Sequence, residues 1–440
     1  MSVLSFPSAG LRTAYASELG CVLDGLTNDS MQINTWLSNA SATNPLRLIM
    51  DGMAATNGII ISAAGYTTIE GLGKGTGFTL LNGSTPAAIY ISGNTSEGAF
   101  GVPPAQSAQY ITVRNLDISP AAGTTGAYGI LLASCGNVLI DNVQIQSPGL
   151  YCACVSNASD VRVSRCSFYS SANIQDGVHV DGPATRVNVA HCTFATGDDS
   201  IALNCPEGYG GNITECVVSD CIFNNSWTVM RIYTSLRATA GDTFYAKQIV
   251  VANCVGSTAQ CAFNLGIEAT AWATPVDQIQ DVLITGCDIR SPNGLAVMRT
   301  PFGTYQFRDC IFRAPTTITP AILVGTPGGG DLALLNFTVL RNADGTAAPP
   351  IVVVGGASLN RLTIDGFRVD DMLTSGYTAI PYVLDVQQPG SGNNSTLSSL
   401  RIYGADMNHV SSLLSSAGSA GISLISGPGV TVNGSLVTVL

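Results

Sequence analysis

A short alternating pattern decides the fold of this chain, and one copy of it reads Val187-Asn188-Val189-Ala190-His191-Cys192-Thr193-Phe194. Apolar side chains take every second position, which is the period of a half-buried β-strand. Two further copies cover residues 161–168 and 217–223, with the same small residue followed by another apolar pair. The pattern therefore predicts strands that recur along the chain.

Extending the pattern in both directions gives a ladder of equivalent positions, spaced by 23 to 38 residues: Asn115, Asn142, Cys166, Cys192, Cys221, Cys254, Cys287, Cys310, Asn336, Gly366 and Gly404. Such a repeat is typical of a solenoid whose coils stack with strands about 4.8 Å apart. The uneven spacing indicates insertions in the turns. We expect the six ladder cysteines to form an internal column of small apolar thiols. We expect no metal on them, because the sequence has no Cys-x₂-Cys pair.

The composition agrees with a β-rich, turn-rich chain, since 48 of the 440 residues are glycine and only 11% are charged. A solenoid grows by adding repeats, so one domain can reach this length. We assign residues 1–45 to an N-terminal cap with a short helix and residues 46–410 to the coils. Residues 411–440 are expected to form a C-terminal β-rich cap or assembly segment.

The charge pattern disfavours two classes of partner. The net charge is −11, and Lys74 and Lys247 are the only lysines, so no surface is expected to neutralise a row of phosphates and we expect no nucleic acid. No apolar run approaches the roughly 18 residues that span a bilayer. The N-terminus also lacks a basic segment followed by an apolar one, so neither membrane insertion nor classical secretion is expected from this sequence.

A short capping helix is predicted over residues 31–37, where Ile33, Trp36 and Leu37 share one face. Asp29 or Ser30 can cap its N-terminus. The apolar face would close the open edge of the first coil.

Three carboxylates form the most informative cluster. Asp176 precedes one strand, and Asp198 and Asp199 precede the next. Aligning the two strands places Asp176 and Asp199 one coil apart, about 5 Å between backbones. Adjacent carboxylates repel, so at least one should have a raised pKa and keep its proton near neutrality. A protonated acid beside an ionised base is what glycosidic hydrolysis requires. An ordinary Gly-Asp-Asp turn is the alternative interpretation.

An exposed polar strip is expected beside these carboxylates. Strand alternation places Arg231 outward in the row of His179 and Ala202. His179 is interpreted as a residue that orients a carboxylate, as a sugar ligand, or as an ordinary exposed histidine. The strip would continue through substrate contacts from Asn264, Glu268 and Arg299, with a solvated face as the alternative.

The acidic turn at residues 23–30, the helix at residues 31–37 and the glycine-rich segment at residues 67–75 resemble the N-terminal pattern of the pectate-lyase-like β-helix superfamily, which includes many enzymes and phage tailspikes. The resemblance implies an all-β fold. The fold it implies is a single-stranded, right-handed parallel β-helix of about 11 or more coils with an N-terminal capping helix.

Within the coils the sequence resembles glycoside hydrolase family 28, the polygalacturonases and their relatives. Of the family motifs N-T-D-G, G-D-D, G-H-G and R-I-K, the first corresponds to Asp176, the second to Asp198 and Asp199, and the fourth to Arg231 with Ile232. The resemblance implies that Asp198 is the general acid, while Asp176 and Asp199 hold and activate the water of an inverting reaction. We expect no cofactor and no metal at this site.

Two departures from the family affect the expected substrate, a polysaccharide or oligosaccharide. The histidine of the third motif is missing from residues 208–211, and Tyr233 replaces the lysine of the fourth. In the family that lysine helps to bind a uronate carboxylate. A neutral or branched glycan is therefore the expected substrate, and Tyr233 is a candidate to stack on a sugar ring.

Three other functions stay open. A polysaccharide lyase would hold Ca²⁺ at the aspartates and use Arg231 as its base. A phage tailspike or surface adhesin would recognise glycans through the same strip, often as a homotrimer with depolymerase activity. Whichever function holds, we expect an extracellular or virion-surface location. A fructan transglycosylase is a further alternative that no residue indicates.

Overall fold

The computed structural model of the protein describes residues 10–83, 85–98, 101–205, 207–234, 244–266, 279–299, 302–314, 320–325, 329–341, 350–355, 358–371, 380–387, 395–407, 410–414, 423–426, 430–432 and 435–436. The chain divides into two compact units, Met1–Ile222 and Phe223–Leu440.

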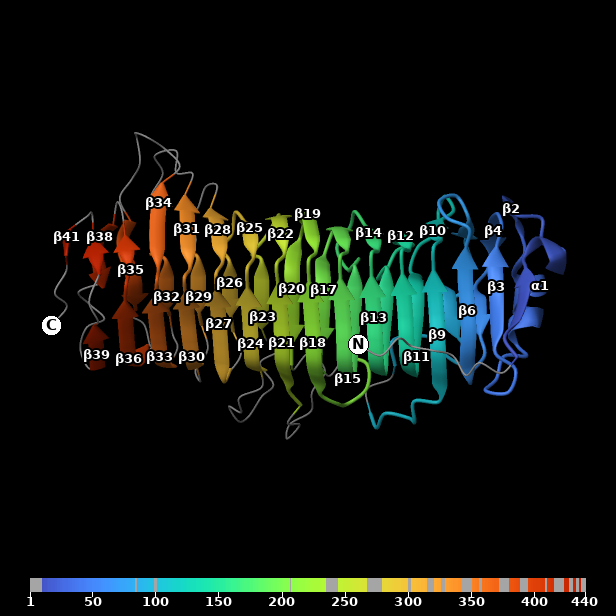
Figure 1. Ribbon diagram of the computed structural model, residues 1–440, viewed down its shortest axis with the longest axis horizontal. Helices are drawn as coiled ribbons and strands as arrows, with labels where there is room; N and C mark the ends of the chain where they lie inside the picture. Colours follow the sequence, from blue (N-terminus) through green and yellow to red (C-terminus); the bar gives the residue numbers. More distant parts are fainter. Residues whose placement is uncertain are drawn as a thin grey trace. The chain divides into compact units, whose positions relative to one another are not determined.

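Stacked parallel strands build three faces of the first unit (Figure 1). The first face consists of β1 (Arg12–Tyr15), β3 (Leu46–Met50), β6 (Gly65–Gly71), β9 (Ala108–Arg114), the second halves of β11 (Tyr128–Asp141), β13 (Ala153–Ser164) and β15 (Val178–Ala190), and β18 (Ile213–Ser219). The second face consists of β5 (Ile59–Ile61), β8 (Ala87–Ile91), the first halves of β11, β13 and β15, and β17 (Asp199–Asn204). The third face consists of β2 (Asp24–Asn28), β4 (Met53–Thr56), β7 (Gly77–Leu80), β10 (Asp117–Pro120), β12 (Gln144–Gln146), β14 (Ser167–Tyr169) and β16 (Thr193–Ala195).

The second unit repeats this arrangement. One face consists of β20 (Thr228–Tyr233), β23 (Phe263–Gly266), β26 (Ala296–Met298), β29 (Ile322–Val324), β32 (Val352–Val354), β35 (Ile380–Val386) and β38 (Val410–Leu414). The next consists of β21 (Ala246–Ala252), β24 (Ile279–Thr285), β27 (Thr304–Arg308), β30 (Gly329–Leu335), β33 (Ser358–Asp365), β36 (Thr396–Tyr403) and β39 (Ser423–Ser426). The third consists of β22 (Val255–Thr258), β25 (Asp288–Arg290), β28 (Ile311–Ala314), β31 (Thr338–Arg341), β34 (Arg368–Asp371), β37 (Asp406–Met407) and β40 (Thr431–Val432), to which β41 (Ser435–Leu436) adds an antiparallel partner. The strand β19 (Ile222–Ser226) contains the boundary of the two units.

This parallel stacking confirms the predicted solenoid. Strand pairing begins before residue 45, with β1 on β3. The predicted domain limits at residues 45 and 410 stay predictions.

The predicted capping helix is present as α1 (Ser30–Leu37), preceded by the 3₁₀ turn η1 (Ser17–Leu19). Ile33 and Leu37 are fully buried, and Trp36 lies 5.0 Å beneath the guanidinium of Arg12. Asp29 is the N-cap residue, but its carboxylate accepts hydrogen bonds from the backbone of an earlier turn instead of capping the helix. In the part of the chain that the structure describes, no helix has the length and apolar character of a bilayer span.

The cysteine column is confirmed, because all six ladder cysteines are buried and unbridged. Each thiol donates to the carbonyl two residues before it. Some also donate to the preceding coil, as Cys166 does to Ile140 at 3.6 Å. These thiols fill the space between coils as small apolar groups.

The other five ladder positions were predicted one residue out of register. Asn115, Asn142, Asn336, Gly366 and Gly404 belong to a separate column of left-handed corner residues, with φ between 48° and 64°. Next to the cysteines the same corner is occupied by Arg165, His191, Asp220, Asn253, Gly286 and Asp309. The side chains that continue the cysteine column come one residue later: Leu116, Val143, Phe337, Phe367 and Ala405.

Candidate functional site

Two consecutive coils of the first unit bring the three predicted carboxylates together. Val178 of β15 pairs with Ile201 of β17, so Asp176 and Asp199 occupy equivalent positions, as the sequence alignment predicted. The amide of Asp199 donates to Asp176 Oδ1 at 3.1 Å. Asp198 Oδ2 accepts the amide of Ile174 at 2.7 Å. One oxygen from each of the three carboxylates lies within 4.8 Å of the others.

The three carboxylates differ in their access to solvent. Asp176 and Asp199 are each 1% exposed, whereas Asp198 is half-buried. A molecule that approaches from solvent therefore meets Asp198 first.

His179 lies beneath these carboxylates, and the interpretation of an exposed histidine is wrong. The side chain is fully buried, and its Nδ1 lies 2.7 Å from Asp176 Oδ2. An ionised carboxylate can only accept, so Nδ1 carries the hydrogen in this contact. The geometry is that of a histidine that orients a carboxylate, which is one of the predicted roles.

Two acidic residues that sequence reasoning missed lie on the other side of the imidazole. His179 Nε2 is 3.1 Å from Asp181 Oδ1 and 3.4 Å from Glu207 Oε2. Asp181 had a signal in the sequence, because Val178 and Val180 point inward and the residues between and after them must point outward. Glu207 had none, since it lies in a loop after β17.

The buried charges perturb one another. Burial lowers the pKa of the imidazole, but Tyr151, Asp181 and the hydrogen bond to Asp176 outweigh it and raise that pKa well above its ordinary value. Burial raises the pKa of Asp181 to about 6, although His179 opposes the shift. The Tyr151 ring stacks on the imidazole with centroids 3.8 Å apart and planes 2° apart.

The segment where the family's third motif falls covers this cluster. A Cβ at Gly208 would lie 2.4 Å from Ser156 Oγ and 2.9 Å from Asp181 Cβ, so only glycine fits at this contact. Tyr209 packs in the same way on Gly98. Residues 207–211 therefore form a close-packed strap over Ser156 and Asp181.

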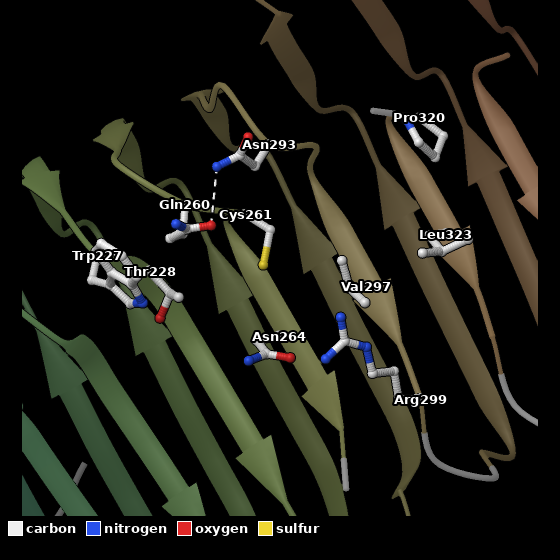
Figure 2. A pocket seen from close by; sticks show the side chains of 10 residues that line it. All are labelled: Trp227, Thr228, Gln260, Cys261, Asn264, Asn293, Val297, Arg299, Pro320 and Leu323. Carbon is white, nitrogen blue, oxygen red and sulfur yellow. Dashed lines mark hydrogen bonds between the residues drawn. The ribbon is translucent and has the colours of Figure 1, made fainter. Parts of the chain in front are cut away.

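The second unit contains a separate groove of about 520 Å³ (Figure 2). It is lined by Trp227, Thr228, Gln260, Cys261, Asn264, Asn293, Val297, Arg299, Pro320 and Leu323. Figure 2 shows amide groups and the Arg299 guanidinium around an opening that Trp227 borders, with the Asn293 amide donating to Gln260 at 3.0 Å. Trp227 is 38% exposed. Asn264 and Arg299 were both predicted as substrate contacts.

Arg231 and Tyr233 lie beside this groove on β20. Arg231 pairs in register with Asn264, and its guanidinium lies 4.5 Å above the Tyr233 ring. The Tyr233 hydroxyl accepts from the Asn264 amide at 3.2 Å. Tyr233 is only 8% exposed, so Trp227 offers a better stacking surface than the predicted tyrosine. Glu268 lies outside the described residues.

Comparison with known proteins agrees with the coil geometry. The family model described as a right handed beta helix region matches residues 101–312. The fold is a right-handed parallel β-helix. A search of curated proteins finds no match to the sequence.

Solved structures with the same β-helix differ widely in their named activities. The family 28 exopolygalacturonase of Yersinia enterocolitica has a TM-score of 0.51 at 11% identity, over 93% of this chain and 79% of that one. PfbA, a surface adhesin of Streptococcus pneumoniae, has a TM-score of 0.58 at 11% identity, over 92% and 91%. Tailspike protein 3 of bacteriophage CBA120 has a TM-score of 0.61 at 13% identity, over 97% of this chain and 62% of the tailspike. At such identities the likeness shows the fold, and function has to be argued from the site.

Proposed function

We propose that this β-helix is a polysaccharide-degrading glycoside hydrolase in which Asp198 is the general acid. The observation that carries the proposal is the cluster of three carboxylates with oxygens within 4.8 Å, of which Asp198 is the most accessible. A proton shared within such a cluster is available to a leaving-group oxygen. Which carboxylate holds that proton stays a prediction.

The buried pair Asp176 and Asp199 is proposed to bind and activate the attacking water. Asp176 is fixed by the imidazole of His179 and by the amide of Asp199. The water would give its proton to this pair as its oxygen attacks the anomeric carbon, while Asp198 protonates the departing sugar oxygen.

Burial supports inversion of the anomeric centre. One oxygen from each of the three carboxylates lies within 4.8 Å of the others. The catalytic carboxyl groups of retaining enzymes are about 5 Å apart, whereas those of inverting enzymes are usually about 6.5–9.5 Å apart, so distance alone would favour retention. A retaining enzyme, however, needs a carboxylate that reaches the anomeric carbon, and Asp176 and Asp199 are each only 1% exposed. Proton NMR of the first-formed anomer distinguishes the two outcomes.

The groove in the second unit is proposed to bind the glycan. Trp227 offers an exposed aromatic face on which a sugar ring can stack. Gln260, Asn293 and Asn264 carry amides that can donate to and accept from hydroxyl groups. Arg299 adds a charge that would bind an acidic substituent on a branched glycan. Glu268 stays a predicted contact.

Digestion of a glycan panel tests the proposal, with Asp198→Asn beside the wild type. Removing a general acid should lower reducing-end release at least about 100-fold while glycan binding is retained. Asp160→Asn is the matched control, because Asp160 lies in an exposed ion pair with Arg186. Unchanged release by Asp198→Asn would refute the assigned acid.

A polysaccharide lyase is the second candidate, because the three aspartates can also hold a cation. A calcium-dependent, unsaturated product that absorbs ultraviolet light would establish it. We further propose an extracellular or virion-surface location. A detergent-resistant homotrimer would favour the tailspike type of depolymerase, and a monomer would oppose it.

A further inference from the structure

The cluster that Asp181 and Glu207 form with His179 Nε2 is distinct from the cluster of Asp176, Asp198 and Asp199. His179 and Asp181 are fully buried, and Glu207 is 6% exposed. One ligand atom from each lies within 4.8 Å of the others. The proposed hydrolysis uses His179 only through Nδ1, so the Nε2 side of the ring has no role in it.

The Nε2 side of His179 faces oxygen atoms of two acidic residues. Nδ1 donates to Asp176, and Nε2 lies 3.1 Å from Asp181 Oδ1 and 3.4 Å from Glu207 Oε2. Buried acidic groups packed this closely are costly unless they share a cation. A divalent cation at this point would be bound by the ring nitrogen and by both carboxylates.

Two orphaned oxygen atoms flank the cluster and point independently to a missing partner. Ser156, Asp181 and Asn204 occupy one register position on three consecutive coils. Ser156 and Asn204 are fully buried, and within the described ranges neither Ser156 Oγ nor Asn204 Oδ1 has a hydrogen-bond partner. Buried polar atoms without partners are rare in native proteins.

The amide of Asn204 is directed at the cluster. Its Nδ2 lies 3.5 Å from His179 Nε2 and donates to Glu207 Oε2. Amide oxygen and nitrogen are exchanged by a half-turn of the side chain. That half-turn would direct Asn204 Oδ1 at the same point as the other ligands.

We propose that His179 Nε2, Asp181 and Glu207, assisted by Asn204, bind a divalent transition-metal ion such as Zn²⁺. One imidazole nitrogen with carboxylate oxygens is a ligand set that zinc accepts. Bonds of about 2.1 Å in a tetrahedron place ligand atoms about 3.4 Å apart. The observed separations of 3.1 and 3.4 Å agree with this value. The Nδ1 hydrogen bond to Asp176 is the usual support for a metal-bound histidine.

The strap and Tyr151 make this a closed site. Gly208 packs on Ser156 and Asp181, and the Tyr151 ring covers the imidazole. The ion would therefore be structural. It would hold His179, and through it Asp176, without contacting the glycan.

Metal content measured directly on the full chain tests the proposal. Wild-type protein purified in zinc-containing medium and dialysed should contain about one zinc per chain by mass spectrometry. Chelator-treated protein should bind added Zn²⁺ in calorimetry and melt at a higher temperature with it. Glu207→Gln and Asp181→Asn should weaken zinc binding at least about 100-fold, because each removes a direct ligand.

Controls separate this site from others. Asp198→Asn should lose hydrolysis and keep its zinc, so a failure of the proposed activity does not affect the metal result. Asp160→Asn should keep both. If Glu207→Gln does not fold, Asn204→Ala removes the assisting ligand and should weaken zinc binding by a smaller factor. The proposal is overturned if the chelator-treated wild type takes up no zinc, or if the two ligand variants bind it as tightly as wild type.

Discussion

Replacement of Glu70 by glutamine should destabilise the first unit by about 2 kcal/mol. Glu70 Oε2 accepts from Arg47 Nε at 2.9 Å and from Arg114 Nη2 at 2.7 Å. The three residues lie on the consecutive strands β3, β6 and β9. Hydrogen bonds to charged groups contribute about 1.5–3 kcal/mol each, whereas exposed ion pairs contribute about 0.2–1 kcal/mol. Glu70 is 14% exposed but its arginines are 33% and 37% exposed, so an intermediate value is expected.

The pH dependence of this loss has a definite sign. Burial raises the pKa of Glu70, but Arg114 and Arg47 outweigh it, so the folded-state pKa is lowered. Stability from a lowered carboxylate pKa is present above the unfolded value, about 4.3, and is lost as pH falls through the folded value. Urea denaturation from pH 7 down to pH 3 should therefore show the wild type and Glu70→Gln converging in acid.

Asp160→Asn breaks an ion pair whose partners are 40% and 50% exposed, and it should cost at most about 1 kcal/mol. A Glu70→Gln loss no larger than that of the control, or one of equal size at pH 3 and pH 7, would refute the reasoning.

Four further measurements follow from the structure. Native protein should react with a thiol reagent at no more than Cys21 and Cys261, because the other cysteines are buried. Burial raises the pKa of Cys21 to about 11, so its reaction at pH 8 should be slow. Reaction of any other cysteine in the native protein would contradict the buried column. Gly208→Ala should cost about 1–3 kcal/mol in denaturation, because its Cβ would overlap a hydroxyl oxygen; an unchanged midpoint would show that the strap yields. Phe337→Ala should cost about 3–5 kcal/mol, because the ring is fully buried; a loss below 1 kcal/mol would indicate local collapse. Tyr151→Phe should keep wild-type kcat, since the phenyl ring preserves the stack on the imidazole. Tyr151→Ala should lower kcat, because it removes the stack. Equal kcat values for the two variants would exclude a role for stacking.

The architecture could be predicted because its signal is local. Each strand carries its own alternation of inward and outward residues, and parallel stacking repeats this alternation in every coil. The capping helix was equally visible, since Ile33 and Leu37 share a face within one helical turn. The same register predicted that Asp176 and Asp199 would meet.

The register at the corners could not be read as reliably. Asn and Gly tolerate left-handed backbone and mark a corner in the sequence. Arg165 and His191 adopt the same conformation, although their side chains carry no such signal. The cysteines one position later are the more conspicuous residues. The predicted ladder therefore combined corner residues with residues of the cysteine column.

The closed cluster could not be predicted because it depends on loops. Glu207 reaches His179 from a segment that no strand period describes, and the strap fits only because Gly208 has no side chain. Contacts of this kind depend on tertiary packing and leave no periodic trace in the sequence.

The hydrogen bond from the Gly177 amide to the Asp199 carbonyl, 2.9 Å long, joins the coils that carry the two buried aspartates. The distance between the backbones of Asp176 and Asp199 is therefore one strand spacing, about 4.8 Å. No substitution on the strands can widen this distance gradually. An evolving chain that needed a longer reach between acid and base would have to recruit a carboxylate from a turn, as with Asp198, or skip a whole coil. Divergence of this scaffold toward new bond-cleaving chemistries should therefore proceed in discrete jumps.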